Sequence, residues 1–167
     1  MTDLTIAKGR IRRAQPEDTE DVLKLLVQVD MVHHNGRPDL FKGPATKYTA
    51  EELRTIFADD NRPVFVFETD NGDGPHVAGY AFCIFEQEKE SHVLTDIRTL
   101  YVDDICVDEN ARGQHIGTQL YEYVKQFAKE QGCYHITLNV WSCNPQAMRF
   151  YEACGMKPYR IGMETIL

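Results

Sequence analysis

Apolar side chains near the start of the chain recur at the spacing of amphipathic helices. Between residues 16 and 33 they return every three or four positions, which predicts a first helix. Residues 49–57 predict a second helix, because Thr49 is a suitable N-cap and Glu52 stands at the capping-box position. The glycines and prolines of residues 36–44 break the pattern between them.

Shorter apolar runs predict strands, at residues 10–14, 63–68, 77–85, 99–107, 135–141 and 157–167. Helical spacing returns at residues 116–131 and 144–154, which predicts two more helices. The order β-α-α-β-β-β-α-β-α-β is typical of an α/β fold with a mixed central β-sheet and helices on both faces. No linker divides the chain, so we expect residues 1–167 to form a single domain.

Composition narrows the class of protein. The chain has 167 residues, of which 43% are hydrophobic, so it can bury a sizeable core. The formal net charge of −8 argues against nucleic-acid binding and favours cationic small molecules or basic peptide ends, unless the charge only keeps the protein soluble. No apolar run is long enough to cross a bilayer and no signal peptide is evident, so we expect a cytoplasmic protein without a membrane partner.

Cysteines and histidines show no metal-site spacing. The five cysteines are an odd number and include no C-x-x-C pair, which favours reduced thiols over disulfides. The six histidines include no helical H-x-x-x-H pair, so we expect no metal ion.

The segment RGQHIG at residues 112–117 lies between a predicted strand and a predicted helix. Gly113 can adopt a positive φ, and Gly117 permits close approach of the backbone. Successive N–H groups at a helix start can bind a phosphate, to which Arg112 adds charge. The alternative is an ordinary connection between a strand and a helix.

Two adjacent carboxylates, Asp103 and Asp104, stand in the apolar run before that turn. In a regular strand they face opposite ways, so Asp104 would share a face with Val102 and Cys106. Burial would raise the pKa of a carboxyl group there and make it a candidate general base. The alternative is a carboxylate at a strand bulge or in a salt bridge.

The segment NPQAMRFYEACGM at residues 144–156 opens with a good N-cap, Asn144, followed by a proline that suits the first helical turn. Phe150 is expected in the core. Tyr151 is either a core residue or a proton donor.

Together these two segments resemble the GNAT superfamily of N-acetyltransferases. RGQHIG is similar to the acetyl-CoA loop [QR]-x-x-G-x-[GA] of that family. The later signature N-x-x-A-x-x-F-Y-x-x-x-G-F is matched by Asn144, Ala147, Phe150, Tyr151 and Gly155, with Met156 in its last place. The predicted order of elements is similar as well.

The resemblance implies acetyl-CoA as cosubstrate. Its pyrophosphate would lie on the backbone N–H groups of Arg112, Gly113, Gln114, His115, Ile116, Gly117 and Thr118. Its pantetheine arm would lie along the backbone of Ile105, Cys106 and Val107, beside Asn144, Ala147 and Tyr151. The N–H near Ile105 would face the thioester oxygen.

His115 departs from the family pattern, which has glycine at that place. Any residue except proline can donate its N–H in a right-handed conformation, and we expect His115 to adopt one. Its imidazole would add a contact to a phosphate.

The resemblance further implies acetyl transfer to a primary amine. Amines are mostly protonated at neutral pH, so a base is needed, and Asp104 or Asp103 would serve, acting through water. Tyr151 would protonate the departing thiolate. One alternative is a non-catalytic domain that binds acyl-CoA as a sensor, and another is a structural protein whose turn is only a connection.

The acceptor amine is less determined by the sequence. In the family the first two helices and their loop line the acceptor side, which here implies His34, Asp39 and Phe41. The alternative is that Phe41 belongs to the core and that Asp39 caps a turn. His34 would then interact with the C-terminal end of its helix. Polyamines, aminoglycosides, basic amino acids and protein N-termini all remain open as acceptors. The resemblance also allows a homodimer, although the sequence indicates no interface.

Overall fold

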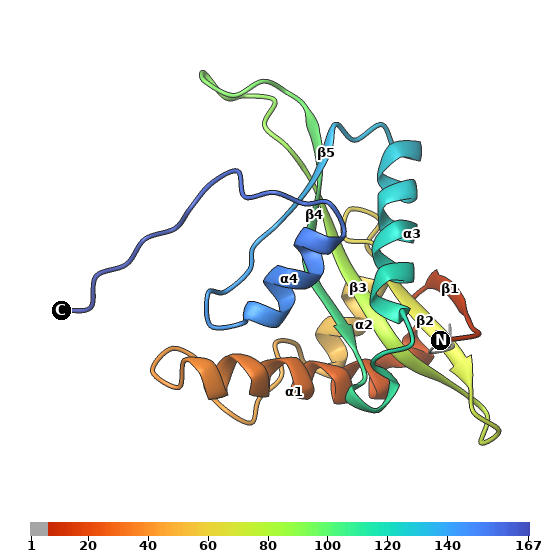
Figure 1. The fold of residues 1–167 in the computed structure, drawn as a ribbon. Helices are drawn as coiled ribbons and strands as arrows, with labels where there is room; N and C mark the ends of the chain where they lie inside the picture. The colour runs from red at the N-terminus through yellow and green to blue at the C-terminus, as the bar shows by residue number, and fades with distance from the viewer. Residues whose placement is uncertain (1–6) are drawn as a thin grey trace, which may run out of the picture.

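The computed structural model describes residues 7–167, and its centre is a five-stranded sheet in the order β1-β2-β3-β4-β5 (Figure 1). The strands are β1 (Arg10–Arg13), β2 (Val64–Asp70), β3 (Pro75–Gln87), β4 (Arg98–Val107) and β5 (His135–Leu138). Neighbouring strands are antiparallel except β4 and β5, which are parallel. The sheet is therefore mixed, as the sequence predicts.

Helices cover both faces of the sheet (Figure 1). They are α1 (Thr19–Gly36), α2 (Ala50–Phe57), α3 (Ile116–Glu130) and α4 (Pro145–Ala153), with short 3-10 turns η1 (Pro16–Asp18) and η2 (Glu109–Ala111). One hydrophobic cluster packs α1 and α2 against one face, around Leu25 and Leu53. A second cluster packs α3 against the other face, around Leu120 and Val124. None of the helices in the described part of the chain is long and apolar enough to cross a membrane.

A β-bulge interrupts β4 at Asp103. Phe82 of β3 stands opposite Asp104 and Cys83 stands opposite Val102, so Asp103 is an extra residue without a cross-strand partner. The bulge reverses the alternation of the strand, because one extra residue turns every later side chain to the other face. The expectation that Val102 and Cys106 share a face is therefore wrong: Val102 packs with α3, whereas Cys106 packs with α1 and α2.

Strands β4 and β5 separate beyond the bulge. Their pairing runs from Thr99 opposite His135 to Val102 opposite Leu138, whereas β4 continues to Val107. After Leu138 the chain leaves the sheet toward α4. The second half of β4 is consequently paired on one side only, next to β3.

The predicted last strand does not form. Residues 157–167 adopt no helix or strand, every one of them is exposed, and the segment leaves the body of the domain (Figure 1). The apolar alternation of this segment is suited to a strand, but the segment pairs with no strand of the described part of the chain. The order of the remaining elements agrees with the prediction.

Candidate active site

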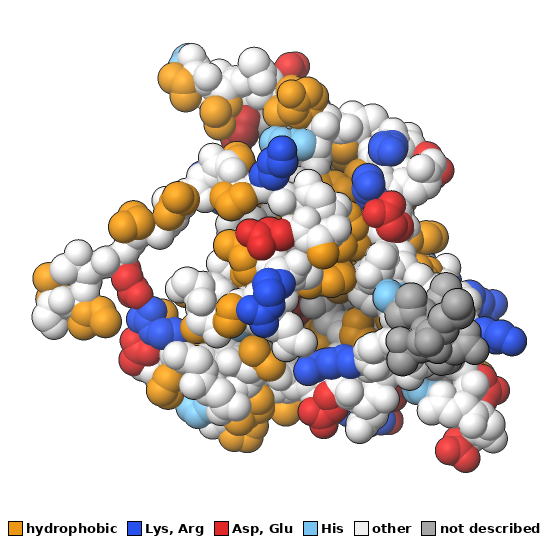
Figure 2. Space-filling view, viewed as in Figure 1, with side chains coloured by type: hydrophobic (Ala, Val, Ile, Leu, Met, Phe, Trp, Pro, Cys, Tyr) orange, Lys and Arg blue, Asp and Glu red, His pale blue; other side chains and the backbone are white. Residues whose placement is uncertain are grey.

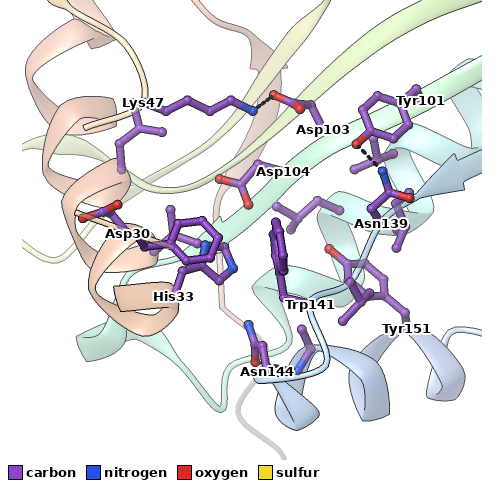
Figure 3. Close-up of a pocket in the computed structure, with 18 of the residues that line it drawn as sticks. Asp30, His33, Lys47, Tyr101, Asp103, Asp104, Asn139, Trp141, Asn144 and Tyr151 are labelled. Carbon is purple, nitrogen blue, oxygen red and sulfur yellow. Dashed lines mark hydrogen bonds and ion pairs between the residues drawn. The ribbon is translucent and has the colours of Figure 1, made fainter. Parts of the chain in front are cut away.

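A cavity of about 530 Å³ opens where β4 and β5 separate (Figure 3). Its walls come from α1, the loop before α2, the second half of β4, the segment after β5, and α4. The residues that line it are Leu26, Val29, Asp30, His33, Phe41, Thr46, Lys47, Tyr101, Val102, Asp103, Asp104, Ile105, Leu138, Asn139, Val140, Trp141, Asn144, Ala147 and Tyr151. Segments far apart in the sequence therefore meet at one site.

The bulge brings both carboxylates of β4 to this cavity. Figure 3 shows Asp104 pointing into it and Asp103 turned toward Lys47. The Tyr80 hydroxyl, from the neighbouring strand β3, donates to Asp104 Oδ2 over 2.5 Å. Burial raises the pKa of Asp104 to about 6, the nearby charge of Asp103 adds to the rise, and the hydrogen bond from Tyr80 opposes it. Asp104 is therefore ionised at neutral pH and has appreciable basicity.

Asp103 is neutralised within the protein. Lys47 Nζ lies 2.6 Å from its Oδ2, and the Tyr48 hydroxyl donates to the same oxygen over 3.2 Å. Burial lowers the pKa of Lys47, but the ion pair with Asp103 outweighs this and the net shift is upward. The lysine thus remains an ammonium held against the cavity wall.

Tyr151 of α4 faces the same cavity. Its pKa is well above the usual value, first because of burial and second because the charge of Asp104 is near. Its hydroxyl makes no hydrogen bond to any residue in the range 7–167, and it is not among the fully enclosed polar atoms that lack a partner. Tyr151 is therefore a protonated phenol whose hydroxyl is available to a ligand.

The N-terminus of α4 is fixed by its cap. Asn144 Oδ1 accepts a hydrogen bond from the Ala147 N–H at 3.1 Å, and both residues line the cavity. This is the N-cap that the sequence predicts, with Pro145 at the first helical position. The cap aims the first turn of α4, and hence Tyr151, at β4.

The backbone of β4 presents unpaired groups to the cavity side. The Asp108 N–H donates to the Ala78 carbonyl of β3, so the antiparallel alternation directs the N–H groups of Ile105 and Val107 away from β3. These are the positions from which β5 has departed. The Cys106 side chain, by contrast, is buried and donates to the Leu25 carbonyl, so only its backbone belongs to this site.

The loop between β4 and α3 carries a run of free amides. Among residues 7–167, no N–H from Gly113 to Thr118 donates to a backbone or side-chain acceptor. The loop turns through Gly113, at φ 79°, and His115, at φ 60° and ψ 20°. The expected right-handed conformation of His115 is therefore wrong: it adopts the left-handed conformation that favours glycine, the residue of the family pattern.

Gly117, at the start of α3, packs closely against α4. A Cβ at Gly117 would lie 3.3 Å from the Phe150 ring and 3.6 Å from a methyl group of Val107. The close backbone approach predicted at Gly117 is therefore an approach to the ring of Phe150, a residue of the second motif. Arg112 also stays near the strand, with its Nε 3.5 Å from the Val107 carbonyl oxygen.

Of the three residues expected on the acceptor side, Phe41 lines the cavity. Asp39 is exposed and pairs with Arg37 at 2.8 Å, outside the cavity. The His34 Nδ1–H donates to the Phe41 carbonyl over 2.8 Å and so fixes the loop. Helix α1 extends to Gly36, and the residue before His34, His33, faces the cavity instead.

Sequence patterns do not point to three further lining residues, Asp30, Lys47 and Trp141, whereas the sequence does offer the pair His33 and His34 as a candidate contact with the substrate. The rings of His33 and Trp141 both contact Phe41, each with a centroid separation of 5.0 Å. The single tryptophan, at the end of the predicted strand of residues 135–141, is a weak signal in the sequence for this aromatic wall. Within residues 7–167, no group of three or more His, Cys, Asp or Glu side chains is arranged to hold a metal ion.

Two N-acetyltransferases and a solved structure are among the known proteins that are similar to this chain. A thialysine N-epsilon-acetyltransferase of Bos taurus is 35% identical over 82 residues, which cover 49% of this chain and 45% of that protein. A probable glucosamine 6-phosphate N-acetyltransferase 2 of Oryza sativa is 28% identical over 152 residues, covering 87% of this chain and 80% of that protein. A crystal structure of a mutant of the BH1408 protein from Bacillus halodurans has a TM-score of 0.88 at 28% identity, covering 95% of this chain and 99% of that one.

The sequence of residues 30–156 matches the Acetyltransferase (GNAT) family. This range contains β4, the loop with free amides and α4. The chain therefore belongs to the GNAT family of acetyltransferases.

Proposed function

We propose that the protein transfers the acetyl group of acetyl-CoA to a primary amine of a small cationic acceptor. The observation that carries this proposal is that Asp104 and Tyr151 line one cavity, beside the half of β4 that β5 does not cover. One group has a pKa of about 6 and the other has a pKa far above neutrality. Groups with such separated pKa values are suited to act as base and acid.

The site fits a long ligand that carries phosphates. The free amides from Gly113 to Thr118 and the positive end of α3 suit a pyrophosphate. The outward N–H groups of Ile105 and Val107 suit the amides of a pantetheine arm. When bound, acetyl-CoA supplies an activated acetyl group, and Ile105 N–H is the donor nearest to the two catalytic candidates along β4.

Proton handling falls to the two side chains. Asp104 accepts a proton from the acceptor ammonium, directly or through water, and so provides the neutral amine. Tyr151 supplies a proton to the leaving thiolate. Asp103 is less suited as the base, because Lys47 and Tyr48 already occupy its Oδ2.

The acceptor half of the cavity favours a cation. Three carboxylates, Asp30, Asp103 and Asp104, line it against one ammonium, that of Lys47. The ring faces of Phe41 and Trp141 can pack on the apolar part of a ligand. The two relatives carry names of enzymes for thialysine and glucosamine 6-phosphate, and the charge balance here favours the amino-acid or polyamine type over a phosphorylated sugar.

Mass spectrometry tests the proposal. The protein is incubated with acetyl-CoA and a panel of polyamines, basic amino acids, aminoglycosides and amino sugar phosphates, and acetylated products are identified. Tyr151→Phe is assayed beside Tyr123→Phe, a matched change on the outer face of α3. We expect acetylated cationic amines, and a turnover loss of roughly tenfold or more in Tyr151→Phe alone.

Calorimetry with acetyl-CoA separates the alternatives. Tight binding without product from any amine would favour the sensor function instead. Absence of binding would contradict both proposals and leave the loop as a structural connection. Acetylation that is limited to phosphorylated sugars would contradict the cationic acceptor but keep the transferase.

A further inference from the structure

The acceptor cavity contains an amine that belongs to the protein itself. The chain has eight lysines, and Lys47 is the one among them that lines this cavity. Figure 3 shows its side chain extending from the loop before α2 along the cavity wall toward Asp103. A lysine side chain carries the group that the proposed reaction acetylates, a primary amine on a carbon chain. The cavity therefore holds one acceptor amine before any ligand enters it.

The backbone around Lys47 is anchored on both sides. The Ala45 N–H donates to Asp30 Oδ2 over 3.0 Å, which ties the loop to α1. Two residues after Lys47, Thr49 begins α2 in a capping box with Glu52. The loop thus keeps the lysine at the cavity while its side chain changes rotamer. A reacting group that is held in place in this way has a high effective concentration.

The contact that holds the Lys47 ammonium against Asp103 can open. The Lys47 side chain is 51% exposed and that of Asp103 is 13% exposed, so water reaches the ammonium end of the pair. An ion pair with one partner this exposed contributes little stability. The charge of Lys47 also acts on Asp104, whose pKa it lowers. The candidate base is therefore a neighbour of this amine as well.

We propose that the protein acetylates its own Lys47 from acetyl-CoA, and that this modification raises its affinity for a cationic acceptor. The inference rests on the proposed transferase function, because the same base and acid take part. Asp104 accepts one proton from the ammonium, directly or through water, and later releases it to water. The neutral Nζ attacks the thioester carbonyl, so that an N–C bond forms and the C–S bond breaks. Tyr151 protonates the leaving thiolate and regains, through water, the second proton that Nζ loses.

Acetylation changes the charge balance around Asp103. An amide carries no positive charge, so Lys47 no longer neutralises this carboxylate, whereas the hydrogen bond from the Tyr48 hydroxyl over 3.2 Å remains. The cavity then presents its three carboxylates without a lysine ammonium. Because an amide hydrolyses very slowly, the change persists through later turnovers. One acetyl transfer within the chain thus prepares the site for a positively charged ligand.

Peptide mass spectrometry tests the modification. The protein is incubated without an acceptor in acetyl-CoA that carries a ¹³C-labelled acetyl group, and the labelled fraction of each lysine is followed over time. Lysine and arginine side chains lie scattered over the face shown in Figure 2, so exposed lysines report the slow chemical acetylation that needs no active site. We expect Lys47 to be labelled roughly tenfold or more faster than Lys42, which is in the same loop.

Controls connect the label to the active site. Asp104→Asn and Tyr151→Phe should each stop the labelling of Lys47 and leave that of Lys42 unchanged. The rate constant for Lys47 should not depend on the protein concentration, because the transfer takes place within one chain. Labelling of Lys42 and Lys47 at equal rates, or labelling of Lys47 that survives both variants, would overturn the proposal.

Calorimetry tests the consequence without turnover. Acetyl-lysine is incorporated at position 47 during synthesis, and spermidine is titrated into this protein and into the unmodified one, both free of acetyl-CoA. We expect the dissociation constant for spermidine to be about two- to fivefold lower in the acetylated protein, as for the loss of a partly exposed ion pair. An equal or higher dissociation constant would overturn the effect on the acceptor.

The outcomes for the two proposals are separate. Acetylation of free amines by a protein whose Lys47 stays unlabelled would overturn self-acetylation and keep the transferase. Absence of both the free acetylated amines and the label on Lys47 would overturn the proposed function too.

Discussion

The Tyr80 hydroxyl donates to the Asp104 carboxylate across two neighbouring strands, at 2.5 Å. Tyr80 is fully buried, so its hydroxyl has no water to bond and the carboxylate is its partner. The contact lowers the pKa of Asp104 against the opposing effect of burial, and the balance is a value of about 6. The hydrophobic core of the protein thus sets the basicity of the candidate base.

The acidic side of the profile of kcat/KM against pH should depend on the contact between Tyr80 and Asp104. Asp104 must be ionised to accept a proton, so kcat/KM is expected to rise with pH through about 6. Tyr80→Phe removes the hydrogen bond that favours the carboxylate, and it should move the limb to higher pH. Initial rates from pH 5 to 8 measure both. An unchanged limb in the variant would mean that another group controls it.

Asp104→Asn should remove most of the activity while keeping the fold. An amide cannot accept the proton of the amine, so kcat should fall by about 10²–10⁴-fold. Asp103→Asn is the matched control, and it should change KM for the acceptor more than kcat. Equal loss of kcat in the two variants would contradict the assignment of Asp104 as the base.

Asp104→Asn should not destabilise the protein at pH 7. The pKa of Asp104 is higher in the folded state than in the unfolded state, so ionisation reduces stability as the pH rises from about 4 to about 6. Asparagine does not ionise, so the variant does not lose stability in this way. Urea unfolding at pH 7 should give the variant a free energy of unfolding at or above that of the wild type, by about 1–2 kcal/mol. At pH 4 the difference should vanish.

Lys47→Met should improve the binding of a cationic acceptor. The lysine ammonium occupies Asp103 at 2.6 Å, and its removal frees that carboxylate for a charge on the ligand. We expect KM for the preferred amine to fall by about two- to fivefold, the range of a partly exposed ion pair. Lys42→Met in the same loop is the control and should have no effect. A rise of KM would mean that Lys47 contacts the acceptor directly.

His115→Gly should stabilise the loop. The left-handed conformation costs a side chain about 1–2 kcal/mol, and the extra freedom of glycine in the unfolded chain offsets part of the gain. We expect a net rise of about 0.5–1 kcal/mol in the free energy of unfolding. Gln114→Gly, at a neighbouring residue without a positive φ, should instead lower it. If His115 contacts a phosphate, the affinity for acetyl-CoA should fall in the same variant.

Much of the fold follows from local patterns. The apolar run of residues 99–107 locates β4 to within one residue, and the N-cap Asn144 locates the start of α4. Both signals lie in the sequence itself. The family resemblance that the two motifs carry is what predicts that Tyr151 and one of Asp103 and Asp104 belong to one site.

Other features depend on contacts that the sequence does not show. A bulge at Asp103 cannot be found from alternation, because the run is apolar on both sides of it. His33 and His34 differ by one step of about 100° around α1. His33 faces the cavity because the helix continues past it to Gly36 and keeps it on the same face as Leu26 and Val29. Residues 157–167 alternate as in a strand, but alternation alone does not show whether a neighbouring strand is in place to pair with them, and they form no strand.

The bulge also has a consequence for how such a protein can diverge. Asp103 has no partner in the ladder between β3 and β4, and its side chain belongs to neither hydrophobic cluster. A change of residue type at this position therefore alters the charge at the cavity without disturbing the strand ladder or either hydrophobic cluster. Loss of the carboxylate would also lower the pKa of Asp104, because the charge of Asp103 helps to raise it. Position 103 is a place where a new substrate preference can arise in one mutational step.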